Sequence, residues 1–362
     1  MDFWRGFALL TIFINHVPGH ALGGWTFRNF GFSDAAELFV LLAGVSAAFA
    51  YMRGFEPGAR LRVTARIVLR AFQLYSGQLA LLMVAAAVVG GFALWTGDER
   101  ILQALHLDLL MQWPMQALVG AAMLTYQPAY LNILPLYVAI LLMAPVLIAA
   151  IRANIAFGLA LSGGLYLLTQ LYALALPVWP SSGTWFFNPF AWQFLFACGL
   201  AIGRMMDTAQ PAPGHRILDV VVGLYLTASL IWAVLGFPVH LDLSPLPAFL
   251  WEFDKTNLSL PRLAHVLALA YAVSRLPLEN ILRASRSAQP LIVMGRHALP
   301  VFCVGTILSF AAQMARLTYD GSVAFDLFIA GVGITVQWLL AWALEWHRSG
   351  LKAVARQRAQ TA

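Results

Sequence analysis

Residues 131–151 read LNILPLYVAILLMAPVLIAAI, a long run without a single charged side chain. A membrane-spanning helix needs about 20 predominantly apolar residues, so this stretch predicts one such helix. Because lipid offers the backbone no hydrogen-bond partners, only helices and closed β-barrels span a membrane. A barrel strand would alternate apolar and polar residues, and this run does not. The stretch therefore favours a helical membrane protein.

The rest of the chain has the same character. Of its 362 residues, 61% are hydrophobic and 10% are charged, whereas about a quarter of a soluble domain is charged. This composition excludes a water-soluble globule, a disordered chain and a small disulfide-stabilised fold. The two cysteines, Cys198 and Cys303, lie inside apolar runs and lack neighbours with metal-ligand spacing. We therefore expect no metal site.

We predict an all-α polytopic membrane protein with about ten transmembrane helices around a central cavity. The expected spans are residues 3–17, 35–55, 67–95, 131–151, 156–176, 190–206, 217–237, 261–278, 290–315 and 323–346. Prolines interrupt residues 100–128, which are expected to form an interfacial or re-entrant helix. Residues 1–348 are predicted to be one integral-membrane domain, and residues 349–362 a basic cytoplasmic tail.

Positive charge is distributed unevenly along this pattern. With a cytoplasmic N-terminus, the loops on that side and the tail carry fifteen Lys and Arg residues, and the opposite loops carry five. Cytoplasmic loops are enriched in Lys and Arg, so both termini are predicted to be cytoplasmic. The net charge is +6, and the basic residues lie in loops beside the spans and form no folded basic surface. No nucleic-acid partner is therefore expected.

The first expected span carries two ionisable residues, Arg5 and His16, in the sequence DFWRGFALLTIFINH (residues 2–16). They lie about three helical turns apart and so share one helix face. Ionisable groups inside a span usually face a cavity or a partner, and a neutral imidazole is suited to act as a general base. The alternatives are a positively charged membrane anchor for Arg5 and a structural hydrogen-bonding role for His16.

The second expected span begins with Asp34 and Glu37, three residues apart. This spacing is typical of a capping box, in which each residue accepts a backbone hydrogen bond at the helix start. In a second interpretation, one carboxylate orients His16 and stabilises its charged form. The two interpretations are compatible. Arg28 and Asn29, in the loop before this span, are placed to make outward-facing contacts.

Further polar residues are expected on the outer side of the membrane. Asp254, Lys255 and Asn257 precede a span and either start a helix or bind a sugar or an acyl carboxylate, with Lys255 as the cation. Asn188 and Gln193 lie among aromatic residues, which form either an interfacial belt or a surface that stacks on sugar rings. Asn132 lies at the outer start of the fourth span.

On the inner side, Arg296 and His297 form a cationic pair suited to phosphate, although a membrane anchor explains Arg296 equally well. The chain has no Walker loop, dinucleotide fingerprint, zinc motif or Gly-x-Ser-x-Gly elbow, which weakens the case for an ATPase, an oxidoreductase, a metalloprotease or a hydrolase. Paired broken helices in matching halves, typical of secondary transporters, are also missing from the sequence pattern.

Six stretches taken together resemble the OpgC family, bacterial inner-membrane proteins that succinylate osmoregulated periplasmic glucans. They are residues 2–19, 26–44, 132–138, 185–199, 254–265 and 295–305. The family belongs to the wider acyltransferase 3 superfamily, whose hallmark is a basic residue, ten residues and then a histidine in the first span. Arg5 and His16 match that spacing.

The resemblance implies ten spans in the bacterial inner membrane, an acyl-CoA donor from the cytoplasm and a periplasmic glucan acceptor. It implies a catalytic role for His16 and leaves succinyl and acetyl donors open. With this donor, Arg5, Arg296 and His297 become expected phosphate ligands. Expected partners are acyl-CoA, the glucan, the lipid bilayer and the proteins that synthesise the glucan, with no tightly bound cofactor. The alternatives are a transporter or flippase that moves a glycan or lipid without chemistry, and a structural partner of a synthesis complex.

Overall fold

The computed structural model describes residues 1–361 except 209–213, 237–242, 244 and 320, without the side chains of 279, 280, 283 and 351–361. The described residues form helices and no β-strand, with one isolated bridge between Pro177 and Thr184. The predicted all-α class is confirmed. The chain divides into two compact units: Met1–Thr26 with Pro277–Ala362 is unit 1, and Phe27–Leu276 is unit 2.

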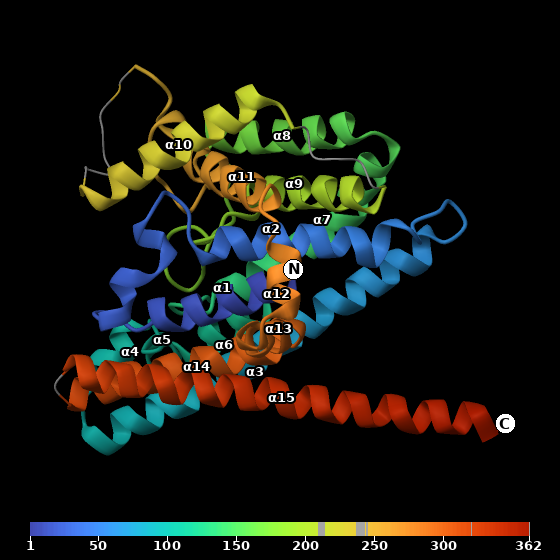
Figure 1. The fold of residues 1–362 in the computed structure, drawn as a ribbon. Helices are drawn as coiled ribbons and strands as arrows, with labels where there is room; N and C mark the ends of the chain where they lie inside the picture. The colour runs from blue at the N-terminus through green and yellow to red at the C-terminus, as the bar shows by residue number, and fades with distance from the viewer. Residues whose placement is uncertain (209–213, 237–242, 244, 320, 362) are drawn as a thin grey trace. The chain divides into compact units, whose positions relative to one another are not determined.

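Unit 2 contains most of the helices (Figure 1). They are η2 (Phe27–Asn29), α2 (Ala35–Ala47), the π-helix η3 (Ala48–Met52), α3 (Arg60–Thr96), α4 (Arg100–Ala104), α5 (Leu109–Gln112), α6 (Pro114–Ala122), α7 (Ile133–Ala153), α8 (Ile155–Tyr172), α9 (Pro189–Asp207), α10 (Arg216–Val234), η4 (Ala248–Leu250) and α11 (Leu260–Ser274). Unit 1 contains α1 (Asp2–Asn15), η1 (Ala21–Trp25), α12 (Leu278–Ala284), η5 (Arg286–Ala288), α13 (Gln289–Arg296), α14 (Ala298–Thr318) and α15 (Val323–Thr361).

Within the described residues, 7 helices are long and apolar enough to cross a membrane. They are Ala35–Met52, Arg60–Thr96, Ile133–Ala153, Ile155–Tyr172, Arg216–Val234, Ala298–Thr318 and Val323–Gly350. The remaining expected spans correspond to α1, α9 and α11. Helices α1 and α11 are shorter, with 14 and 15 residues, and α9 carries Gln193 and Arg204 among its apolar residues. The count of ten therefore stays a prediction.

Two expected segments differ from the structure. The span predicted over 290–315 is broken at His297, where the backbone leaves helical geometry and separates α13 from α14. The segment 100–128 forms the short helices α4, α5 and α6, and even the longest, α6, has only 9 residues. None of them is long enough to cross a membrane, and the interfacial or re-entrant placement stays a prediction.

The core of unit 2 lies around α9, which packs against α2, α7 and α8. The large side chains of Trp192 and Phe196 are fully buried there. A Cβ on Gly199 would overlap the backbone carbonyl of Leu41, and one on Gly44 would overlap that of Phe196. Glycine at both positions lets α2 and α9 approach closely, as small residues do between membrane helices. This contact fixes the C-terminal half of α2 relative to α9.

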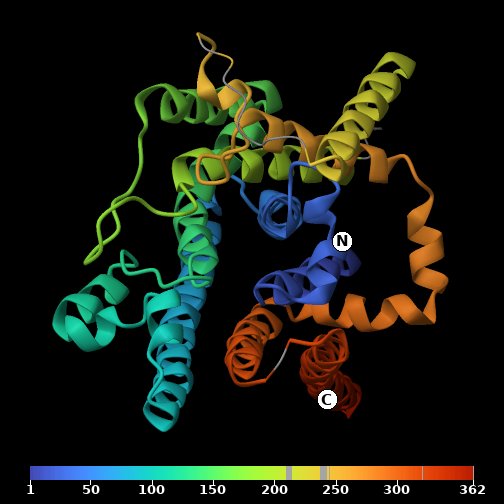
Figure 2. The ribbon, with the colours of Figure 1, turned by 90° about the vertical axis from the view of Figure 1, so that its left-hand side faces the viewer.

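In unit 1, α1 packs against α13 and α14, and α15 packs against both α13 and α14. Figure 2 shows α14 and α15 beside each other in the red part of the ribbon. Gly6 of α1 and Gly295 of α13 are again points where a Cβ would overlap the partner's backbone. Unit 1 is therefore built on the long helices α14 and α15 together with the shorter α1 and α13.

Candidate functional site

The start of α2 carries the capping box that the sequence predicts. Asp34 Oδ1 accepts a hydrogen bond from the Ala36 backbone N–H at 2.8 Å. Glu37 Oε2 accepts one from the Asp34 backbone N–H at 2.9 Å. These bonds satisfy two of the N–H groups that a helix start leaves without an intrahelical partner. The capping interpretation of both carboxylates is confirmed.

The same two carboxylates belong to a cluster of four charges, which we call the ion quartet: Asp34, Glu37, Lys255 and Arg262. Lys255 Nζ lies 2.5 Å from Asp34 Oδ2. Arg262 Nε donates to Glu37 Oε1 at 2.7 Å, and Arg262 Nη2 lies 3.4 Å from Asp34 Oδ2. The Glu37 side chain is 0% exposed, so its charge depends on the guanidinium because a buried charge needs a partner.

The charge state of Asp34 follows from its neighbours. Burial alone would raise the pKa of this carboxyl, but Lys255 and Arg262 together hold the pKa well below its usual range. Asp34 is therefore a carboxylate at neutral pH. It completes a cluster that pairs two acidic side chains with two basic ones.

The loop that supplies Lys255 is held in place by its neighbours. The Asp254 carboxylate accepts from the backbone N–H groups of Thr256 and Asn257, both at 2.9 Å. Trp192 Nε1, from α9, donates to the backbone carbonyls of Lys255 and Thr256. Asp254 therefore stabilises the turn, and the hydrogen bonds from Trp192 of α9 fix the backbone position of Lys255.

The amide side chains predicted to bind a glucan also have partners inside unit 2. Asn188 Nδ2 donates to Asn257 Oδ1 at 2.9 Å and to the Leu174 carbonyl at 2.6 Å. Gln193 Nε2 donates to the Ser162 carbonyl at 2.9 Å. Asn188 and Gln193 are both buried, and their contacts give them a structural role. Glucan binding by Asn188, Gln193 and Asn257 stays a prediction.

The other predicted outer residues are Arg28, Asn29 and Asn132. Arg28 is exposed in η2, and Asn29 ends η2 half-buried. Burial raises the pKa of Tyr130, and the nearby Arg28 opposes that rise. Asn132 occupies the cap position before α7 without a side-chain hydrogen bond to that helix. Their predicted role in binding the glucan or the acyl carboxylate stays a prediction.

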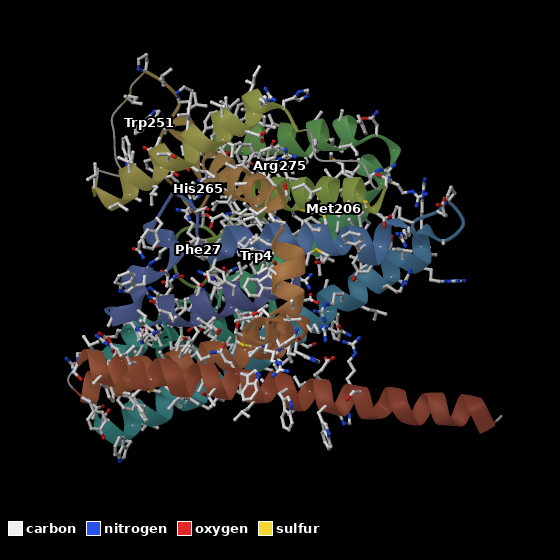
Figure 3. The ribbon with its side chains drawn as sticks, in the orientation of Figure 1. Trp4, Phe27, Met206, Trp251, His265 and Arg275 are labelled. Atoms are coloured by element: carbon white, nitrogen blue, oxygen red, sulfur yellow. The ribbon has the colours of Figure 1, made fainter. Side chains whose placement is uncertain are left out.

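Arg262 and a second polar pair were not among the predicted site residues. Ser33 Oγ and His265 Nδ1, both buried, lie 2.7 Å apart, and His265 of α11 is labelled in Figure 3. The sequence did carry a signal for Arg262. An arginine inside an expected span requires a charged partner, and Glu37 at the start of another span is a suitable one.

In unit 1, the loop after α1 is held by α14 and α15. We call residues 16–21 the His16 loop. Gln313 Nε2 donates to the His16 backbone carbonyl at 2.6 Å, and Arg316 Nη2 donates to the Gly19 carbonyl at 3.0 Å. Arg316 also pairs with Asp326, whose Oδ2 accepts from the Ala21 N–H at 2.7 Å. Three side chains therefore fix the backbone on both sides of the loop.

The helix that carries His16 ends slightly before the expected limit of the first span, residue 17. Helix α1 ends at Asn15, and His16 is the residue that caps it. Gly19 follows with φ +72°, a conformation that favours glycine. His16 therefore lies where a helix end meets a tightly held turn.

The predicted phosphate ligands of unit 1 lie together, with acids that the prediction did not include. Arg5 Nη1 lies 3.2 Å from Asp2 Oδ1, and Arg296 Nε lies 3.7 Å from Asp2 Oδ2. Glu345 of α15 is shared by Arg296 and His297, at 3.2 and 2.9 Å. We call these five residues the basal cluster. Its positive charges are largely balanced, and phosphate binding there stays a prediction.

His16 belongs to unit 1, whereas Asp34 and Glu37 belong to unit 2. The predicted contact between the histidine and one of these carboxylates therefore stays a prediction. Within the described part of the chain, no group of three or more His, Cys, Asp and Glu side chains is arranged to hold a metal ion.

Comparison with known proteins gives one match. The family described as OpgC protein matches residues 1–349, nearly the whole chain. No curated protein and no solved structure matches the chain. The family match covers both units, and it includes His16, the ion quartet and the basal cluster. The chain is therefore a member of the OpgC family.

Proposed function

We propose that this chain is a membrane O-acyltransferase. It moves a succinyl or an acetyl group from cytoplasmic acyl-CoA to a hydroxyl of a periplasmic glucan, in the bacterial inner membrane. The observation that carries the proposal is the OpgC family match over residues 1–349 of a chain rich in membrane-spanning helices. The buried pairs Glu37–Arg262 in unit 2 and Asp326–Arg316 in unit 1 add support, because charges inside a membrane protein are costly and usually functional.

In the proposed reaction, His16 acts as the general base. Its imidazole takes the proton of the glucan hydroxyl, and the oxygen attacks the thioester carbonyl of the acyl-CoA. The bond between carbonyl carbon and sulfur then breaks, and the CoA thiolate leaves and takes up the proton. An acyl-histidine intermediate is the alternative route, and trapping a labelled acyl-enzyme distinguishes the two.

In this proposal, Asp34 or Glu37 stabilises the imidazolium as the third member of a triad does. Both carboxylates already accept hydrogen bonds from Lys255 or Arg262. His16 would therefore meet an acidic side chain that already has a cationic partner. Lys255 and Arg28 are the proposed partners of a succinyl carboxylate, and the other outer polar residues would contact the glucan.

On the opposite side, Arg5, Arg296 and His297 are the proposed ligands for the phosphates of the donor. Guanidinium groups match phosphate geometry well. Asp2 and Glu345 already pair with these cations, so a phosphate has to share the cations with two carboxylates. The lipid bilayer and the proteins that synthesise the glucan are the further proposed partners.

The first experiment measures acyl transfer from radiolabelled succinyl-CoA, and separately acetyl-CoA, to a periplasmic glucan extract. Purified wild type, His16→Ala and His347→Ala are compared, because His347 is an exposed histidine on α15. We expect transfer from one donor, lost in His16→Ala and kept in His347→Ala. General-base catalysis contributes about a hundredfold to ten-thousandfold, so the loss is expected to be at least about a hundredfold.

Two results would overturn the proposal. Full activity in folded His16→Ala would exclude the histidine as the base. Folded wild type that transfers neither group and does not bind CoA would favour the transporter or flippase. Binding of CoA to the detergent-solubilised protein is the measurement that separates these outcomes.

A further inference from the structure

Three helices of unit 2 end at one polar cavity. The cavity has a volume of about 270 Å³, and its lining consists of Ala48, Met52, Arg53, Glu56, Arg152, Arg204, Asp207 and Thr208. These residues come from η3 and the turn after it, the last turn of α7, and the end of α9. In Figure 3, the label of Met206 marks the end of α9, two residues beyond Arg204. We call this cavity the arginine pocket.

The charges of the arginine pocket do not balance. Arg53 Nε donates to Asp207 Oδ2 at 2.9 Å. Arg152 pairs with Glu56, and its Nη1 donates to the Met52 carbonyl at 2.6 Å. Among the residues that the structure describes, the guanidinium of Arg204 has neither a hydrogen bond nor an ion pair. Three arginines against two carboxylates leave one positive charge, and it belongs to Arg204.

The pocket lies where membrane spans end. The segments Ala35–Met52 and Ile133–Ala153 are both long and apolar enough to cross a membrane, and the pocket is built from the last residues of each. An arginine at such a position faces the layer of lipid headgroups. The buried side chains of Ala48 and Met52 give the pocket an apolar wall beside its charged rim.

We propose that the arginine pocket binds the phosphodiester of an anionic lipid headgroup, with Arg204 as its main ligand. Basic pockets between transmembrane helices are known to bind such headgroups, and the planar guanidinium can hold two phosphate oxygens at once. A phosphodiester carries a single negative charge, which matches the single unbalanced positive charge.

The size of the pocket supports the same ligand. Sites for drug-sized molecules have volumes of about 300–1,000 Å³, and the arginine pocket is smaller. It fits a phosphodiester with its glycerol better than a nucleotide with several phosphates. A competing explanation is that Arg204 interacts only with the carbonyl end of α9, where a positive charge is favourable. That explanation predicts no dependence on lipid.

The test measures the thermal unfolding of the full chain in a neutral detergent. Dioleoylphosphatidylglycerol is titrated in and compared with dioleoylphosphatidylcholine, CoA and inorganic phosphate. We expect phosphatidylglycerol to raise the Tm of the wild type and the other three to leave it nearly unchanged. Arg204→Gln should need about tenfold more phosphatidylglycerol for the same rise, since a hydrogen bond to a charged group is being removed.

Two control variants separate the pocket from general electrostatics. Arg100→Gln removes one positive charge beyond the opposite end of α3, where Arg100 pairs with Asp98. The double variant Arg53→Gln/Asp207→Asn removes one charge of each sign from the pocket and keeps its net charge. We expect both controls to keep the lipid affinity of the wild type within about twofold, because both keep Arg204 and neither changes the net charge of the pocket.

The proposal is overturned if phosphatidylglycerol protects Arg204→Gln as well as it protects the wild type, or if phosphatidylcholine protects equally. Protection by CoA or by inorganic phosphate that depends on Arg204 would also overturn it, since the phosphate source would then be soluble. None of these outcomes depends on acyl transfer. Failure of the lipid site is therefore distinguishable from failure of the proposed reaction.

Discussion

At the scale of single residues, the ion quartet is the feature with the largest energetic consequence. Glu37 has no access to water, and its charge is compensated mainly by Arg262. The pKa of Asp34 is lowered by Lys255 and Arg262 against the effect of burial. Asp34 therefore stabilises the fold at every pH above its unfolded pKa of about 3.9, and this contribution is lost as the pH falls through the lowered pKa.

Replacing Arg262 by methionine tests this compensation. Removing one partner of a buried ion pair typically costs about 3–5 kcal/mol, because the other charge stays behind. We expect Arg262→Met to lower the free energy of unfolding in detergent by about that amount. The double variant Arg262→Met/Glu37→Gln should recover most of the loss, because it removes the stranded charge. Equal stability of Arg262→Met and wild type would show that the pair contributes nothing.

At the scale of the elements, the sequence predicts local features better than breaks in long apolar runs. The capping box at Asp34 follows from two residues of one turn and was predictable. The break at His297 was not, because Gly295 and Arg296 leave the apolar pattern almost intact on both sides. The fragmentation of residues 100–128 was partly predictable, since proline favours the first position of a helix and Pro114 starts α6.

The ion quartet and the His16 loop show why the candidate sites were only partly predictable. Asp34, Glu37 and Lys255 stand out as polar residues beside expected spans. Arg262 joins them through the packing of α11 on α2, which are separated by more than two hundred residues of chain. The contacts of Gln313 and Asp326 with the His16 loop are equally distant in sequence. A sequence gives the identities of such residues, but tertiary packing decides which of them meet.

The hydrogen bonds that hold the His16 loop predict a kinetic effect of replacing Gln313. Gln313→Ala removes the hydrogen bond to the His16 carbonyl, so the imidazole is held less firmly while the binding residues stay in place. We expect kcat for acyl transfer to fall about tenfold or more with little change in KM, because a small misplacement of a catalytic group is costly. The control is Gln112→Ala, which removes an exposed glutamine in unit 2. An unchanged kcat in folded Gln313→Ala would show that Gln313 does not position His16.

At the scale of the whole molecule, the contacts of unit 1 bear on how the chain crosses the membrane. Asp326 of α15 lies beside the His16 loop, and Glu345 lies in the basal cluster. These two residues are separated by about 28 Å of helix, close to the thickness of about 30 Å of a bilayer core. The His16 loop and the basal cluster therefore contact opposite ends of a helix that is long and apolar enough to cross a membrane.

This arrangement predicts that α1 crosses the membrane although it is only about 21 Å long. It runs beside α14, from Asp2 near Arg296 to His16 near Gln313, and α14 is one of the candidate spans. A cysteine inserted after Met1, in a chain without its native cysteines, should therefore react with an impermeant maleimide only after spheroplasts are lysed. Trp25→Cys, on the other side of α1, should react before lysis. If both cysteines react before lysis, α1 does not cross, and the cytoplasmic N-terminus predicted from the charge distribution is wrong.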